Sequence, residues 1–78
     1  MTTLRLFAAA REAAGTGRST IDATTVGGVL DEAEARFGPA FSEVLATCRV
    51  WVNGDPADRT QPVGPADEVA VLPPVSGG

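Results

Sequence analysis

Residues 25–39, TVGGVLDEAEARFGP, carry the strongest helix pattern in the chain. Their apolar side chains recur at i, i+3, i+4, i+7 and i+11, the spacing of one helix face: Val26, Val29, Leu30, Ala33 and Phe37. The hydroxyl of Thr25 can cap the first turn, while Gly38 and Pro39 are typical of a helix end. The stretch therefore predicts one amphipathic helix, whose apolar face has to be covered by other elements.

Runs of alternating apolar and polar residues on both sides of this helix predict a sheet that covers it. The predicted strands are residues 3–8, 18–24, 48–53 and 68–72, with a very short one between 55 and 65. Short helical turns fit residues 9–14 and 41–45. The order strand-strand-helix-strand-(strand)-strand predicts an α+β fold of the ubiquitin-like β-grasp type. It has a mixed sheet of four or five strands, packed on one main helix, with the first and last strands parallel in the middle. We expect residues 1–72 to form this domain.

Alternation assigns the strand residues to two faces of the sheet. Six apolar residues would face the helix: Leu4, Leu6, Val50, Val52, Val69 and Val71. Phe7, Trp51 and Leu72 would then lie on the opposite, open face, with Arg5 and Arg49 beside them. Large apolar groups on an uncovered face predict a docking site for a partner protein, continued by Pro73 and Pro74. The alternative is that loops cover this face, or that single apolar residues on the surface have no role.

The sequence ends in a segment without a bulky side chain after Val75: Pro73, Pro74, Val75, Ser76, Gly77 and Gly78. The two prolines cannot continue a strand, so residues 73–78 are expected to form a mobile tail. The α-carboxylate of Gly78 is ionised at neutral pH and is a poor electrophile unless another enzyme activates it. We expect this tail to be inserted into the active site of another protein. The alternative is an ordinary frayed terminus, which also collects small residues.

Composition excludes several classes of function. The chain has 78 residues and a net charge of −4, so a nucleic-acid partner is not expected. It contains no histidine and no lysine, which removes Ser-His and Cys-His pairs, histidine metal ligands and Schiff bases. No metal site and no autonomous enzyme are therefore expected. We assign no function to Cys48, the single cysteine, because such a residue is usually a small apolar packing group.

The composition also suggests a location. No apolar run approaches the roughly 20 residues that span a bilayer, and the first residues lack the apolar core of a signal peptide. A single cysteine agrees with a reducing compartment, because it allows no disulfide within the chain. We expect a cytoplasmic protein without a membrane partner.

Four motifs resemble those of the MoaD family, the small subunits of molybdopterin synthase among the ubiquitin-like sulfur carriers. They are Phe7-Ala8-x-x-Arg11-Glu12-x-x-Gly15, Val52-Asn53-Gly54, Asp67-Glu68-Val69-Ala70, and Leu72-Pro73-Pro74-Val75-Ser76-Gly77-Gly78. The resemblance covers essentially the whole chain. The thiamine sulfur carrier is similar in fold and in its Gly-Gly end, but it lacks the first motif.

The resemblance implies a function as a carrier of sulfur, with the catalytic groups supplied by partners. A MoeB-like enzyme of the ubiquitin-activating type would use ATP and magnesium to adenylate the Gly78 carboxylate. A sulfur donor, such as a cysteine desulfurase or a rhodanese, would then convert it to a thiocarboxylate. Val75, Ser76 and Gly77 would carry this group into a MoaE-like large subunit. There its sulfur would pass to a cyclic pterin phosphate precursor of molybdopterin.

Two other interpretations remain open from the sequence. A thiocarboxylate carrier could deliver its sulfur to the synthesis of cysteine, thiamine or thiolated tRNA instead. A β-grasp domain could also act as a non-covalent interaction module, or as a ubiquitin-like protein conjugated to amines. Additional residues after Gly78 separate these interpretations, because only the covalent ones require a free terminal carboxylate.

Overall fold

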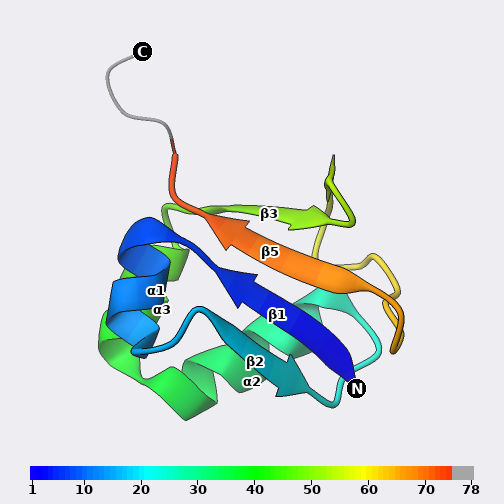
Figure 1. Ribbon diagram of the computed structural model, residues 1–78, viewed down its shortest axis with the longest axis horizontal. Helices are drawn as coiled ribbons and strands as arrows, with labels where there is room; N and C mark the ends of the chain where they lie inside the picture. Colours follow the sequence, from blue (N-terminus) through cyan, green and yellow to red (C-terminus); the bar gives the residue numbers. More distant parts are fainter. Residues whose placement is uncertain (75–78) are drawn as a thin grey trace.

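Strands β1 (Thr2–Leu6) and β5 (Glu68–Leu72) lie side by side and parallel in the middle of a mixed sheet (Figure 1). The computed structural model describes residues 1–74. Strand β2 (Arg18–Ile21) pairs antiparallel with β1, and β3 (Arg49–Val52) pairs antiparallel with β5. Strand β4 (Asp55–Pro56) completes the five-stranded order β2-β1-β5-β3-β4. The predicted β-grasp fold, with the first and last strands parallel in the middle, is confirmed.

Helix α2 (Val26–Phe37) is the predicted amphipathic helix and lies behind the sheet in Figure 1, while the next helix lies at the left beside α1. Thr25 Oγ1 accepts a hydrogen bond of 3.1 Å from the Gly28 N–H, which satisfies one of the free donors of the first turn. Gly38 ends the helix with a φ of 90°, a conformation that favours glycine. Helix α3 (Pro39–Leu45) follows at once, with a proline in its first turn.

The sequence placed the end of the first strand too late. Strand β1 ends at Leu6, and helix α1 (Ala8–Ala14) begins two residues later, where the prediction had a strand up to Ala8. Ala8 has a φ of 51°, a left-handed conformation that ends the extended backbone. The Phe7 N–H donates to the Val71 carbonyl over 3.2 Å, so Phe7 stays attached to the end of β5. The second strand is also shorter than predicted and ends at Ile21.

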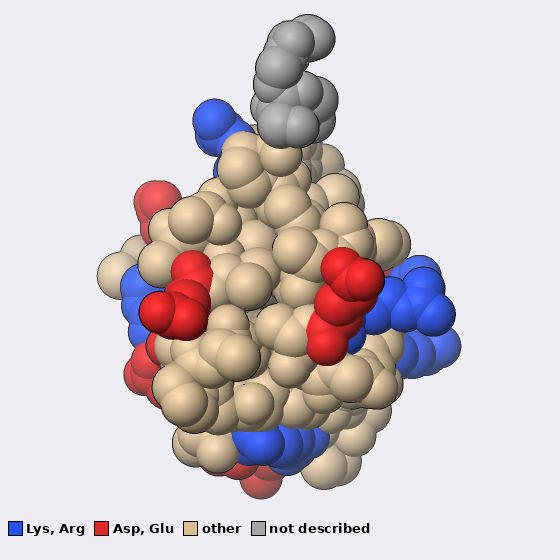
Figure 2. Space-filling view, turned by 90° about the vertical axis from the view of Figure 1, so that its left-hand side faces the viewer, with Lys and Arg blue, Asp and Glu red and all other residues tan. Residues whose placement is uncertain are grey.

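The core lies between the sheet and the helices. Its fully buried side chains come from both layers and include Leu4, Leu6, Val26, Val29, Phe41, Val69 and Val71. Val50, which the alternation also placed in the core, is half-buried and packs against it. In the described part of the chain, none of the helices has the length and apolar character needed to cross a membrane. Basic side chains (blue) lie at several places around the margin of the side shown in Figure 2, with the largest group on the right.

Candidate functional site

A groove of about 610 Å³ lies on the open face of the sheet, where the tail of the chain leaves β5. Its lining residues are Phe7, Arg49, Trp51, Gly54, Glu68, Ala70, Leu72, Pro73 and Pro74. All five residues that the sequence singled out for docking are among them: Phe7, Trp51, Leu72, Pro73 and Pro74. The structure therefore brings these residues together, and their role in docking remains a prediction.

Strand register explains why the open face is hollow at this point. Trp51 of β3 lies directly opposite Ala70 of β5, and Arg49 lies opposite Leu72. The methyl group of Ala70 is the smallest side chain among these four, so it leaves space beside the indole ring. The alternating pattern had placed Ala70 on this face, but its part in forming the groove depends on the cross-strand pairing.

Phe7 forms the wall of the groove on the β1 side. It is 37% exposed, an unusual position for a large apolar side chain in a domain with a complete core. The guanidinium of Arg5 lies over its ring, 5.5 Å from the centroid, and Arg5 Nη1 lies 3.5 Å from Glu68 Oε2. Such an exposed ion pair stabilises the fold by only about 0.2–1 kcal/mol. The ion pair joins the Phe7 side of the groove to Glu68 of its wall.

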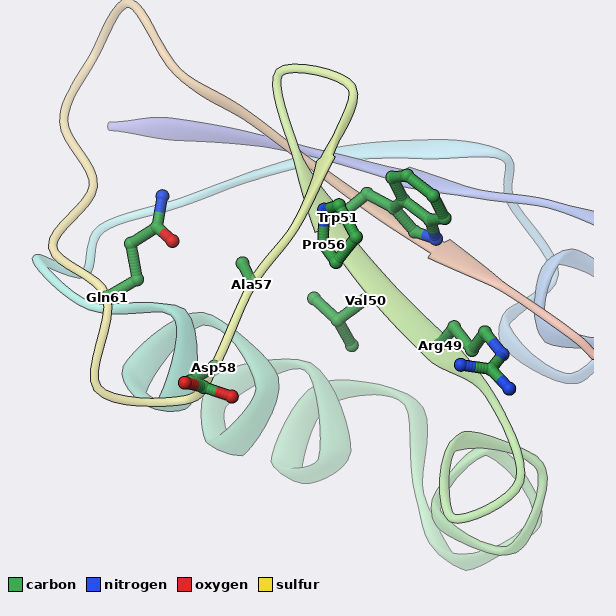
Figure 3. Close-up of a pocket in the computed structure, with 7 residues that line it drawn as sticks. All are labelled: Arg49, Val50, Trp51, Pro56, Ala57, Asp58 and Gln61. Carbon is green, nitrogen blue, oxygen red and sulfur yellow. The ribbon is translucent and has the colours of Figure 1, made fainter.

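A second, more polar hollow of about 360 Å³ lies between β3 and the segment that follows β4. Figure 3 shows Val50 pointing toward the helices and Trp51 pointing to the opposite side of the strand, as the alternation predicted. Asp58 and Gln61 of the following loop line this hollow. The residues around it include no nucleophile beside a base, so it offers no evident chemistry.

Cys48 lies outside both hollows, at the start of β3. Its Sγ donates to the Val44 carbonyl over 3.2 Å, and the side chain packs partly against the core. Burial raises the pKa of the Cys48 thiol, which disfavours the reactive thiolate. This environment agrees with the packing role expected from the sequence. Within residues 1–74, no three carboxylate or thiol side chains come together as a possible metal site.

The residues assigned to tail chemistry are Val75, Ser76, Gly77 and Gly78, and they lie outside the described residues. Their assignment therefore stays a prediction. The two prolines before them are described, and both contribute to the wall of the groove. A protein that docks in this groove would contact the chain immediately before the residues expected to carry the reactive group.

Comparison with known proteins places the chain among ubiquitin-like carriers. The model described as the ThiS family matches residues 4–78. The molybdopterin synthase sulfur carrier subunit of Phaeosphaeria nodorum is 38% identical over 58 residues, which are 64% of this chain and 60% of that protein. The match thus spans less than two thirds of the length of this curated relative.

Solved structures show the same fold. The crystal structure of SAMP1 from Haloferax volcanii has a TM-score of 0.79 and 34% identity, and the match covers 99% of this chain and 98% of that one. One chain of the complex of subunits 1 and 2 of molybdopterin-converting factor from Helicobacter pylori has a TM-score of 0.75 and 22% identity. That match covers 99% of this chain and 97% of the other, and at this identity it shows the fold alone.

Proposed function

Because the chain belongs to the ThiS family, we propose that it is a sulfur carrier, with Gly78 as the residue that holds the sulfur. The family match extends to Gly78, and the curated relative is named a sulfur carrier subunit of molybdopterin synthase. The observation that carries the proposal is the groove formed by Phe7, Trp51 and Leu72. It is an apolar surface whose lining includes Pro73 and Pro74, the last described residues before the tail.

The proposed chemistry takes place at the terminal carboxylate. A carboxylate oxygen attacks the α-phosphorus of ATP, pyrophosphate leaves, and the acyl-adenylate forms on the activating enzyme, which supplies the magnesium. Sulfur delivered as sulfide then bonds to the acyl carbon, and the bond to AMP breaks to give a thiocarboxylate. The chain has no histidine or lysine to act as a general base, and we propose that its partners supply the catalytic groups. It acts as a group carrier for its partners, and we propose that it holds no permanent cofactor.

We propose the large subunit of molybdopterin synthase as the protein that occupies the groove. The Helicobacter pylori complex joins a chain of this fold to a second subunit, which shows that the fold is compatible with such an assembly. In the assembled synthase, the thiocarboxylate would transfer its sulfur to a cyclic pterin phosphate precursor. Glycine at positions 77 and 78 suits this step because a side chain there would obstruct a narrow channel.

Protein modification is the second candidate function. The Haloferax volcanii protein, a small archaeal modifier, matches nearly the whole of both chains at 34% identity. The activated Gly78 would then be attacked by an amine of a target protein, and the product would be an amide instead of a thiocarboxylate. Both candidates share the adenylation step and differ in the nucleophile that displaces AMP. Delivery of the sulfur to cysteine, thiamine or tRNA synthesis would differ only in the final acceptor.

The decisive experiment is an intact-mass measurement after incubation with the activating enzyme, ATP, magnesium and a sulfide source. Replacement of one oxygen by sulfur at Gly78, located by fragmentation, is the expected result. A variant with one alanine appended after Gly78 is the matched control, and it should keep its fold and remain unmodified. An unmodified wild-type mass would overturn the carrier proposal. Amide-linked adducts to other proteins, without a thiocarboxylate, would favour the modifier.

A further inference from the structure

Arg5 and Arg18 lie directly opposite each other on β1 and β2. The next pair of opposite residues along the two chain segments is Leu6 and Gly17, and the Leu6 N–H donates a hydrogen bond of 2.9 Å to the Gly17 carbonyl. The two arginines therefore occupy the intervening position without ladder bonds, where side chains of paired strands are closest. Like charges directly opposite each other destabilise a sheet. The fold thus has an unfavourable pair on its open face.

A third arginine joins this pair. The side chain of Arg11, from α1, packs against Gly17. A Cβ added to Gly17 would lie 3.3 Å from the Cδ and from the Nε of Arg11. The three guanidinium-bearing side chains line one hollow of about 390 Å³, together with Phe7, Thr16 and Gly17. We call Arg5, Arg11 and Arg18 the arginine cluster. It brings half of the six basic residues of an acidic chain to one place.

The folded domain neutralises only part of this cluster. All ten Asp and Glu residues lie within the described residues 1–74, and none of them lines the hollow. Within that part of the chain, Arg11 and Arg18 form no ion pair, and Arg5 is paired with Glu68, as Arg36 is with Glu32 and Arg59 with Asp31.

The cluster is continuous with the docking groove. Phe7 lines both hollows, and Arg5 contacts the Phe7 ring and the Glu68 side chain of the groove wall. A protein seated on Trp51 and Leu72 would therefore reach the arginines by extending past Phe7. Its complementary groups would be carboxylates, which guanidinium groups bind through charge-assisted hydrogen bonds. The net charge of −4 disfavours a nucleic acid, whose backbone phosphates the rest of the surface would repel.

We propose that the arginine cluster binds an acidic segment of the protein that docks in the groove, with the carboxylates of that segment relieving the repulsion between Arg5 and Arg18. This inference takes the identity of the partner from the proposed function. The chemistry of the arginine cluster does not depend on that function. Because charges at the rim of an interface act mainly on the encounter, the cluster should raise the association rate and make it dependent on ionic strength.

The first test measures association of the full chain with the large subunit of molybdopterin synthase by stopped flow at low and high ionic strength. Arg18→Glu should lower the association rate constant by about 10-fold at low ionic strength, and the difference should shrink as salt is added. This variant should fold, since it places a carboxylate opposite Arg5. The double variant Thr60→Glu/Gln61→Glu changes the net charge by the same amount on the loop after β4, which is hydrogen-bonded to the start of α2. It should change the rate by less than about twofold.

Two outcomes separate the inference from the proposed function. If Trp51→Arg abolishes binding and Arg18→Glu behaves like the loop control, the groove is the docking site and the inference about the arginine cluster is wrong. If the wild-type chain does not bind the large subunit, the proposed partner is wrong, and a titration without a partner decides the inference. In that titration, hexaglutamate should shift the Nε–Hε NMR signals of the three arginines. No shift, or an equal response to inorganic phosphate, would overturn the inference.

Discussion

Asn53 Nδ2 donates a hydrogen bond of 2.8 Å to Asp67 Oδ1, and Asn53 Oδ1 accepts one of 2.9 Å from the Glu68 N–H. Asp67 Oδ2 accepts a further bond of 2.8 Å from the Gly64 N–H. These contacts join the turn after β3 to the loop that enters β5. They also explain why Asn53 holds a φ of 49°, a left-handed conformation that asparagine tolerates better than most residues. The pair thus fixes one end of the docking groove, at Gly54.

Asp67 should make the stability of the domain dependent on acid pH. The hydrogen bonds from Asn53 and then Gly64 lower the pKa of Asp67, so the folded state holds the ionised form more strongly than the unfolded chain does. The resulting stabilisation is complete above the unfolded pKa of about 3.9 and is lost as the pH falls through the lower, folded pKa. Asp67→Asn should be less stable than wild type at neutral pH, and this difference should decrease toward about pH 3. Urea unfolding at a series of pH values measures this difference in the free energy of unfolding. Asp22→Asn is the control for loss of a negative charge. A difference that stays constant with pH would contradict this account.

Thr25 should stabilise helix α2 through its hydroxyl. Thr25→Ala removes the acceptor for the Gly28 N–H and should lower the free energy of unfolding by about 1 kcal/mol. Thr25→Ser keeps the hydroxyl and should lose much less. Chemical denaturation of the two variants gives the comparison. Equal losses would mean that the methyl group of Thr25 matters and the cap does not.

Trp51 should matter for binding and little for folding. It is only half-buried and lines the groove, so we expect Trp51→Arg to change the free energy of unfolding by about 1 kcal/mol or less. The same variant should abolish binding to the large subunit, because it puts a charge into an apolar surface. Phe41 is fully buried, and Phe41→Ala should destabilise the domain by about 3–5 kcal/mol. Calorimetric titration and thermal unfolding of both variants test this contrast. Unfolding of the Trp51 variant would place that residue in the core.

Arg18 should reduce the stability of the free domain. Arg18→Glu replaces a like-charged pair across β1 and β2 by an oppositely charged one, which should raise the free energy of unfolding by up to about 1 kcal/mol. The gain should be largest at low ionic strength, because salt screens exposed charges. Arg18→Thr should give a smaller gain. Urea unfolding at two salt concentrations measures both. A loss of stability would mean that the arginine pair is compatible with the free fold.

Local signals predicted the elements that depend on neighbouring residues. Helix α2 follows from its apolar spacing, its Thr25 cap and its Gly38 end, all within a short segment of chain. Strand β5 has the predicted bounds because Pro73 stops it. The end of β1 was misplaced, since the change of direction at Ala8 accompanies the attachment of Phe7 to Val71 of a distant strand. Alternation continues through Phe7 and Ala8 in the sequence and gives no sign of that contact.

The amino-acid sequence by itself determined the fold class, the face on which the core residues Leu4, Leu6, Val52, Val69 and Val71 lie, and five of the nine residues that line the groove. These features follow from periodicity, which any short segment carries in its own side chains. Tertiary structure alone decided that Ala70 lies opposite Trp51 and that Arg5 lies opposite Arg18. Both depend on strand register, which is set jointly by residues far apart in the chain. The hollow of the groove and the charge beside it are therefore properties of pairs of strands, and no single stretch of sequence contains them.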